Sequence, residues 1–232
     1  MPSEDAWRIP RKPEVVNEPE RYRTADLLGA WHSLIGRHSA KSGTDDVGRQ
    51  LLASWSEPHR RYHNVIHLRE VLRHVDQLAA HAVTPDAVRL AAWYHDAVYN
   101  GFSDDEQNSA ARAETELADL NVAPALVLEV ARLVRLSASH TPDAGDRNGQ
   151  VLCDADLAVL ASTAESYAAY AAAVRAEYAH VTEKEFRLGR SKILRSLLDG
   201  PALYRTAPAR AQWEAAARVN LNTELERLES TE

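Results

Sequence analysis

Several residue types are scarce in this chain, and each scarcity excludes a class of protein. Among 232 residues Cys153 is the only cysteine, so a disulfide within the chain is excluded and a reducing compartment is expected. No apolar run approaches the roughly 20 residues that cross a bilayer, so we expect no membrane-spanning helix and no membrane partner. The first residues also lack the apolar segment of a secretory signal. These features predict a cytoplasmic protein.

Positively charged residues are also fewer than acidic ones. Lysine and arginine number 27 against 34 acidic residues, which gives a formal net charge of −7. A nucleic-acid polymer or an acidic membrane face is therefore not an expected partner, although a local basic pocket is compatible with this balance. The sequence leaves the oligomeric state open, a homo-oligomer included.

Proline is concentrated near the start of the chain, where four prolines fall within residues 1–20. Because proline fixes its own φ and has no N–H to donate, these residues are predicted to form an extended arm. Residues 21–232 are predicted to form one helical domain, and their length and apolar content are sufficient for a single core.

Apolar residues in the rest of the chain recur at helical spacing. Leu68, Val71, Leu72 and Val75 form one such stripe. Thr84 and Pro85 resemble an N-cap followed by proline at the first helical position, and the segment from there to Tyr99 is apolar on most sides, which predicts a central helix. Sustained alternation of β-branched residues is absent from the sequence. The predicted fold is therefore all-α, a single compact bundle of about eight to ten helices.

Helix starts are indicated by three capping-box pairs and by one proline near the end of the chain. The pairs are Ser103 with Glu106, Ser162 with Glu165, and Thr182 with Glu185. A last helix is predicted from about Pro208 to Leu228.

Ionisable residues interrupt several apolar stretches. His63 and His67 are four positions apart, so they share one face of a helix and could bind a metal or handle protons. Taken alone, the pair is explained better by an ordinary, partly exposed helix face. His95 and Asp96 stand among apolar neighbours, and a buried carboxylate is costly unless it is paired or bound to a cation. A histidine–aspartate hydrogen bond between helices is the simpler alternative.

A second pair of carboxylates raises the same question. Asp154 and Asp156 lie in the otherwise apolar segment "VLCDADLAVL". Asp154 could cap a helix with its side chain, whereas no such role accounts for Asp156. Spacing by itself does not decide which of the two binds a cation.

The order His67, then His95 and Asp96, then Asp156 resembles the H…HD…D signature of the HD superfamily of metal-dependent phosphohydrolases. "YHNVIHLREV" and "CDADL" are also similar to the metal motifs of class I cyclic-nucleotide phosphodiesterases. Residues 60–160 carry this resemblance, and the whole chain is most similar to small bacterial proteins described as predicted HD phosphohydrolases. "RAEY" at 175–178, "FRLGR" at 186–190 and "ARVNLN" at 217–222 fit the C-terminal half of that group less specifically. The resemblance does not extend to the nucleotide pocket of the phosphodiesterases.

The resemblance implies a hydrolase with His67, His95, Asp96 and Asp156 as ligands of a divalent transition metal, with His63 as proton donor. A mixed nitrogen and oxygen ligand set suits manganese, iron, cobalt, nickel or zinc, with one ion expected and two compatible with the sequence. Asp156 rather than Asp154 is the ligand that the resemblance implies. The expected substrate is a small phosphoester, with a nucleotide as one candidate.

Three further sets of residues are candidates for the site. His140 is a candidate second-metal ligand or phosphate contact, and a histidine at a helix C-terminus explains it equally. Glu106 could orient the attacking water, although its capping-box position accounts for it as well. Arg187, Arg190 and Lys192 are candidate phosphate-binding cations, and a solvated helix face is the alternative for each.

Two other functions remain open on the sequence. Some HD proteins hold two irons and use oxygen to cleave a carbon bond, so an HD-type di-iron oxygenase is the enzymatic alternative. The non-enzymatic alternative is a helical binding or regulatory module with a structural metal site.

Overall fold

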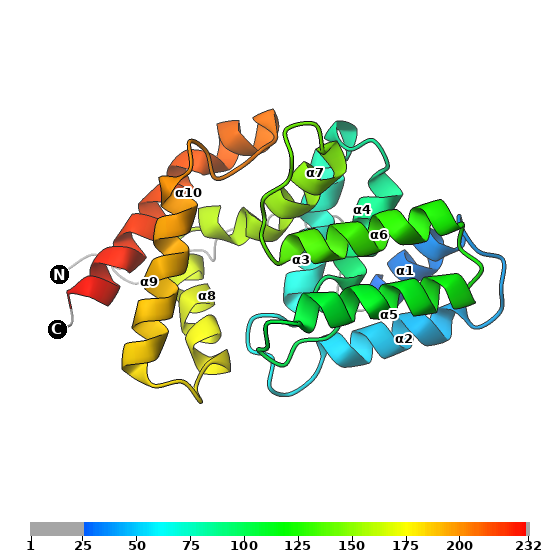
Figure 1. Cartoon of the computed structure of the whole chain (residues 1–232), viewed down its shortest axis with the longest axis horizontal. Helices are drawn as coiled ribbons and strands as arrows, with labels where there is room; N and C mark the ends of the chain where they lie inside the picture. Colours follow the sequence, from blue (N-terminus) through cyan, green and yellow to red (C-terminus); the bar gives the residue numbers. More distant parts are fainter. Residues whose placement is uncertain (1–25, 231–232) are drawn as a thin grey trace, which may run out of the picture.

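The computed structural model describes residues 26–230, and within this range it contains α-helices and short 3-10 helices but no strand. The all-α prediction is therefore confirmed (Figure 1). The extended arm predicted for residues 1–20 lies outside the described residues. The elements are α1 (Leu27–Ile35), α2 (Thr44–Trp55), α3 (Val65–Leu78), η3 (Ala79–His81), α4 (Pro85–Tyr94), α5 (Asp105–Asp119), α6 (Pro124–Ser137), α7 (Arg147–Asp156), η4 (Leu157–Ala161), α8 (Ala164–Glu177), α9 (Glu183–Asp199) and α10 (Ala207–Glu229).

Helix α4 is the centre of the core, as its apolar sequence predicts. Seven of its ten residues are buried, and it packs against α1, α3, α5, α6 and α7. The rings of Trp31 and Trp93 meet edge to face at 5.3 Å between centroids, and the indole N–H of Trp55 donates to the carbonyl of Trp93 at 3.0 Å. Aromatic rings in this arrangement add to the stabilisation from burial. The core therefore fixes α3, α4 and α7 relative to one another.

Helices α8, α9 and α10 lie side by side at the other end of the molecule (Figure 1). They contact the core mainly through α10, which packs on η4. The side-chain amide of Asn220 donates to the carbonyls of Leu160 and Ser162 at 2.9 Å each, which attaches α10 to η4. This unit faces the start of α3 and the end of α7, where the candidate ligands lie.

The helix starts were predicted with mixed success. Pro85 opens α4, α10 begins at Ala207, and Thr182 with Glu185 forms a capping box. The pair Ser162–Glu165 is wrong by one position, because Thr163 is the N-cap of α8.

The pair Ser103–Glu106 is also wrong as a capping box. Helix α5 begins one residue after Asp104, and the side chain of Asp105 accepts hydrogen bonds from the N–H groups of Asn100, Gly101 and Phe102. The carboxylate of Asp105 therefore holds the preceding loop, and no side chain caps the start of α5.

No single helix within residues 26–230 is long and apolar enough to cross a membrane. The segments 147–161 and 164–177 reach that length and composition together, but the chain bends by 108° between them.

Candidate metal centre

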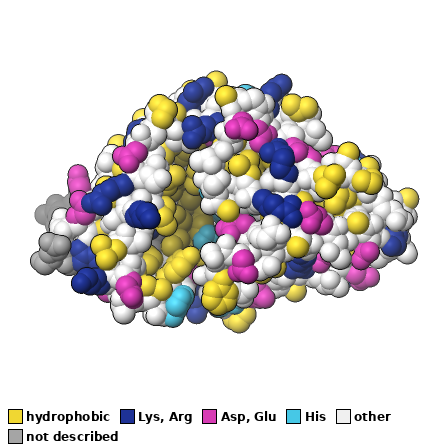
Figure 2. Space-filling view, viewed as in Figure 1, with side chains coloured by type: hydrophobic (Ala, Val, Ile, Leu, Met, Phe, Trp, Pro, Cys, Tyr) yellow, Lys and Arg dark blue, Asp and Glu magenta, His cyan; other side chains and the backbone are white. Residues whose placement is uncertain are grey.

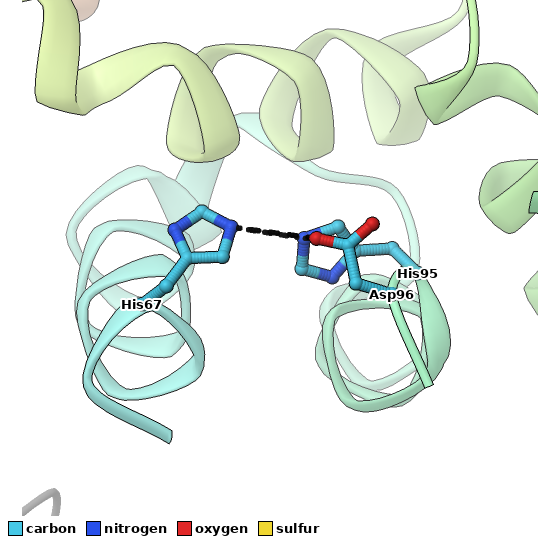
Figure 3. Close-up of side chains that lie close together, drawn as sticks. All are labelled: His67, His95 and Asp96. Atoms are coloured by element: carbon cyan, nitrogen blue, oxygen red, sulfur yellow. Dashed lines mark hydrogen bonds and ion pairs between the residues drawn. The ribbon is translucent and has the colours of Figure 1, made fainter. Parts of the chain in front are cut away.

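Two histidines and an aspartate meet where the end of α4 faces the start of α3. The Nε2 atoms of His67 and His95 lie 3.2 Å apart, and Oδ2 of Asp96 lies 3.2 Å from Nε2 of His95 and 3.8 Å from Nε2 of His67. Figure 3 shows His67 on α3 pointing across to His95 and Asp96 at the end of α4. Donor atoms of these three residues all lie within 4.8 Å of one another, as they would around one metal ion.

The end of α4 explains how two adjacent residues reach the same point. The sequence predicted a helix continuing to Tyr99, but α4 ends at Tyr94 and His95 is its C-cap. The buried guanidinium of Arg60 donates to the carbonyls of Asp96 at 2.7 Å and His63 at 3.1 Å. A cation at a helix C-terminus satisfies carbonyls that have no partner within the helix. Because the chain turns here, Asp96 is not held to the 100° offset of a continuing helix.

Asp156 reaches the same cluster from the last residue of α7. Its Oδ1 lies 3.1 Å from Nε2 of His67 and 3.5 Å from Nε2 of His95. Its Oδ2 accepts a hydrogen bond from Nε2 of His140 at 2.7 Å. The structure therefore brings together all four of the ligands predicted from the sequence, with His140 behind Asp156.

The side chains around the cluster are buried and oriented by aromatic rings. His67 and His95 are 5% and 1% exposed. The ring of Trp55 lies 5.3 Å from that of His95, and the ring of Tyr62 lies 4.7 Å from that of His67. Nδ1 of His95 is 2.9 Å from the carbonyl oxygen of Ala92. Because a carbonyl only accepts, this nitrogen carries the proton, and Nε2 of a neutral His95 presents its lone pair to the cluster.

The electrostatics of the cluster are those of a cation site. Burial lowers the pKa of His67, against the opposing effect of Asp156, so its imidazole is neutral at pH 7. Burial also disfavours the charged form of His95, but Asp96 and Asp156 outweigh it and raise the pKa of His95 to about 9. Burial would raise the pKa of Asp156, yet the surrounding histidines hold it well below its ordinary range. Asp156 therefore stays ionised at a buried point. His95 carries the balancing positive charge when it is protonated, and a bound cation would take the place of that proton.

The donor set fits a divalent transition metal. Ligand atoms bound at about 2.1 Å to one ion are about 3 Å apart. The Nε2 atoms of His67 and His95 lie 3.2 Å from each other and 3.1 to 3.8 Å from an oxygen of each aspartate. Neutral imidazoles with carboxylates are the ligands that such metals prefer.

His63 lies next to the cluster and is held by a residue that the sequence reasoning missed. Its ring centroid is 5.6 Å from that of His67. Its Nδ1 donates to Oε2 of Glu177 at 2.7 Å, and Tyr99 donates to the same oxygen at 3.0 Å. The other oxygen of Glu177 accepts the N–H groups of residues 61, 62 and 63 at 2.7, 2.8 and 3.0 Å. Glu177 belongs to the motif "RAEY", which is the sequence feature that could have pointed to it.

Asp154 points to the opposite side of α7 from the cluster of candidate ligands. Its side chain is fully buried and accepts the N–H groups of Arg205 and Thr206 at 2.7 Å each. Thr206 is the N-cap of α10, so Asp154 joins α7 to the start of that helix. It lies within α7 and is not the N-cap of this helix, because α7 begins at Arg147.

Glu106 and the predicted phosphate-binding cations lie in different surroundings. Glu106 is partly buried, and burial together with the charges of Asp96 and Asp105 raises its pKa. Arg190 is buried and donates to both carboxylate oxygens of Glu224 at 2.8 and 3.0 Å.

The other two predicted cations also lie on α9. Arg187 donates to the carbonyl of Leu228 and borders a hollow of about 400 Å³ between α8, α9 and α10, while Lys192 is exposed. Contacts with α10 therefore engage Arg187 and Arg190, and neither residue lines the cleft that leads to the metal cluster.

A cleft of about 690 Å³ gives access to the cluster, and His67 and Asp156 form part of its lining. Its walls are α3 on one side and η4 with α8 on the other. Figure 2 shows this hollow between the α8–α10 unit and the rest of the molecule, with hydrophobic side chains on the α8 side and histidine and acidic groups along the opposite edge. A small molecule can therefore reach the candidate ligands.

Comparison with known proteins gives no further guidance. The chain matches no family model, no curated protein and no solved structure. What the cluster can do follows from its own geometry.

Proposed function

We propose that this protein is a metal-dependent phosphohydrolase of the HD type that acts on a small phosphoester. The main support is the convergence of His67, His95, Asp96 and Asp156 from three separate helices on one buried point. The order of these residues along the chain is that of the HD signature. A cleft of molecular size opens on the same point.

His67, His95, Asp96 and Asp156 would hold the metal, for which manganese, iron, cobalt, nickel and zinc are the candidates. Such an ion, when bound, lowers the pKa of a coordinated water and stabilises negative charge on phosphoryl oxygens. The aromatic rings of Trp55 and Tyr62 pack against the two imidazoles and keep them oriented.

His63 is the proposed proton donor to the leaving oxygen. Its Nδ1 is engaged by Glu177, so Nε2 is the atom that would give up a proton as the bond between phosphorus and the leaving oxygen breaks. The oxygen of water forms the new bond to phosphorus, and the products are inorganic phosphate and an alcohol. Glu177 is a positioning residue, because it holds both the imidazole of His63 and the backbone that carries it.

One contact supports a second candidate function. His140 donates to the outer oxygen of Asp156, so a histidine stands on each side of this carboxylate. A second metal ion bound there would make a di-iron oxygenase of the HD type the alternative enzyme.

Elemental analysis followed by activity assays tests the proposal. The purified protein is expected to carry about one divalent transition metal per chain and to release phosphate from members of a nucleotide and sugar-phosphate panel. Removing the metal with a chelator should abolish turnover, and adding back Mn²⁺ should restore it. Two irons per chain with oxygen consumption would favour the oxygenase. Absence of both bound metal and turnover would leave a helical binding module and refute the proposal.

A further inference from the structure

Within the described residues, three arginines line the access cleft, and two of them already have a carboxylate partner. Arg69 and Arg73 both donate to the carboxylate of Glu70, at 3.1 and 3.0 Å. The third, Arg61, is exposed, and its guanidinium has no hydrogen-bond or ion-pair partner within residues 26–230. Arg61 can therefore take up an anionic ligand without giving up a contact in this part of the chain.

The neighbouring Arg60 supplies the cation that this segment needs for its own structure. Its guanidinium is buried and donates to Oε2 of Glu57 at 3.0 Å. It also donates to the carbonyls of Asp96 and His63 at 2.7 and 3.1 Å. Because Arg60 makes these contacts, the charge of Arg61 is not required to hold the segment.

The backbone of Arg61 is fixed by two side chains. Its N–H donates to Oε1 of Glu177 at 2.7 Å, and its carbonyl accepts from the side-chain amide of Asn64 at 3.0 Å. Glu177 also accepts from the imidazole of His63 at 2.7 Å. A side chain on a fixed backbone loses less freedom on binding a ligand than one on a mobile segment. The same glutamate thus positions Arg61 and the proposed proton donor.

The segment that carries Arg61 also contacts the metal cluster. The ring of Tyr62 lies 4.7 Å from that of His67 and 4.6 Å from that of Tyr170, and all three residues line the cleft. Consecutive α-carbons are about 3.8 Å apart, so Arg61 lies at the same end of the cleft as His67. A phosphate at the candidate ligands is therefore next to the segment that carries this guanidinium.

The shape of a guanidinium restricts the kind of phosphoester that it fits. Its N–H groups bind two oxygens of one phosphate side by side. When a metal ion is bound at the cluster, it contacts one oxygen of the scissile phosphate. A two-point contact with Arg61 then requires two further oxygens that carry no substituent. A phosphomonoester has three unsubstituted oxygens, whereas a phosphodiester has two.

We infer that Arg61 binds the scissile phosphate and that the substrate is a phosphomonoester. The guanidinium contacts two unsubstituted oxygens and stays protonated, while proton transfer to the leaving oxygen belongs to His63. The reaction in this inference rests on the proposed function, whereas the affinity of Arg61 for a phosphate-like dianion is a property of the cleft and can be measured without turnover.

The first experiment measures binding. Affinities for phenylphosphonate, which has three unsubstituted oxygens, and for its monomethyl ester, which has two, are determined by calorimetry with and without Mn²⁺. Arg61→Gln should bind phenylphosphonate about ten-fold more weakly than the unaltered protein, because a charged two-point contact is lost. The loss for the ester should be only about three-fold, because a single contact is lost.

These binding results separate the inference from the proposed function. The expected losses support the inference even if no phosphoester is hydrolysed, in which case the proposed function alone fails. Equal affinity of Arg61→Gln and the unaltered protein for phenylphosphonate overturns the inference, and so does absence of binding by the unaltered protein.

The second experiment measures hydrolysis by the Mn²⁺-loaded protein. Arg61→Gln should raise KM for 4-nitrophenyl phosphate about ten-fold and change kcat little, because Arg61 contacts the phosphate in the ground state and the transition state alike. The ratio of kcat/KM for this monoester to that for methyl 4-nitrophenyl phosphate should fall in the variant. A preference of the unaltered protein for the diester, with the same ratio in Arg61→Gln, would overturn the assigned substrate class.

Two further variants complete the test. Arg61→Lys keeps the charge but not the planar fork, so its affinity for phenylphosphonate should be intermediate. Full affinity in Arg61→Lys would contradict the two-oxygen contact.

Arg49→Gln is the matched control, because it removes another exposed arginine that pairs with Asp46 on α2 and does not line the cleft. Affinity and KM should stay unchanged in this variant. An equal loss in Arg49→Gln would show that overall charge, and not Arg61, attracts the anion, and would overturn the assignment.

Discussion

The α1–α7 region and the α8–α10 unit are built by different interactions. Seven of the ten residues of α4 are buried, nearly all of them apolar, whereas in α9 the buried residues are Arg190, Ser191 and Leu194. Helices α9 and α10 are joined by the ion pair of Arg190 with Glu224, and α10 is tied to the core by Asn220 and Asp154. The candidate ligands thus sit in the apolar region, and the polar unit forms the opposite wall of their cleft.

This difference indicates a division of roles. Close-packed apolar side chains hold atoms to fixed separations, which is what a metal site requires. Directional hydrogen bonds fix the orientation of the second unit at fewer points. We therefore expect substitutions at the cluster to change metal content and substitutions in the polar unit to change stability, and the following predictions test this separation.

The largest effect is expected from His95→Ala. Loss of a direct ligand should lower metal affinity by at least about 100-fold and reduce phosphate release correspondingly. Metal content and turnover are measured together, and circular dichroism checks the fold. His32→Ala is the control, because His32 is exposed and pairs with Asp45 away from the cluster. Full metal content in His95→Ala would show that His95 is not a ligand.

Two aspartates of α7 provide the second comparison. Asp156→Asn should weaken metal binding about 100-fold, because it removes a negative ligand between His67 and His95. Asp154→Asn should leave metal content unchanged but lower the free energy of unfolding by about 2 kcal/mol, because buried N–H groups at the start of α10 lose a charged acceptor. Chemical denaturation and metal analysis of both variants separate these roles. The reverse pattern would exchange the assignments of the two residues.

Arg190→Ala tests the polar unit itself. Removing Arg190 leaves Glu224 largely buried without its cation, so the free energy of unfolding should fall by about 3 kcal/mol while metal content stays the same. The double variant Arg190→Met with Glu224→Leu should recover most of this loss, because it removes both charges. If the single variant Arg190→Ala lost its metal as well, the two regions would not have the separate roles that we expect.

The smallest expected effect is on pH dependence. Burial would raise the pKa of Glu177, but His63 and the N–H groups of Tyr62 and His63 outweigh it and lower this pKa to about 2, below the ordinary value of 4.5. A carboxyl whose pKa is lower in the folded state stabilises the fold above pH 4.5 and loses this contribution as the pH falls toward about 2. The stability advantage of the unaltered protein over Glu177→Gln should therefore shrink across this range.

Urea unfolding at several pH values measures this advantage. The same variant tests the positioning role, because glutamine can still accept the backbone N–H groups but no longer pairs a charge with the imidazole of His63. Its kcat for phosphate release should fall while its KM changes little, because the imidazole is held less firmly. An unchanged kcat would remove Glu177 from the proposed chemistry.

The local structure was largely accessible from the sequence. The periodicity of Leu68, Val71 and Leu72 and the proline at position 85 predicted helices that the structure contains, because a buried stripe and a helix start depend on neighbours within a few residues. The predictions that failed concern the ends of helices. Helix α5 began at Asp105 without the predicted Ser103 cap, and α4 ended at Tyr94, before the predicted position, where Arg60 binds the carbonyl of Asp96 just beyond the helix.

The candidate site likewise depends partly on local sequence and partly on tertiary contacts. The sequence by itself predicted most of the helices and placed ionisable residues in apolar stretches. The resemblance carried by the order of the motifs then selected His67, His95, Asp96 and Asp156 among them. Only the tertiary structure decided between Asp154 and Asp156 as neighbours of the histidines, placed Glu177 on His63, and turned Arg190 toward Glu224. The physical reason is range: helix formation depends on residues a few positions apart, whereas these contacts join residues separated by 34 to 114 positions and exist only once the core has packed.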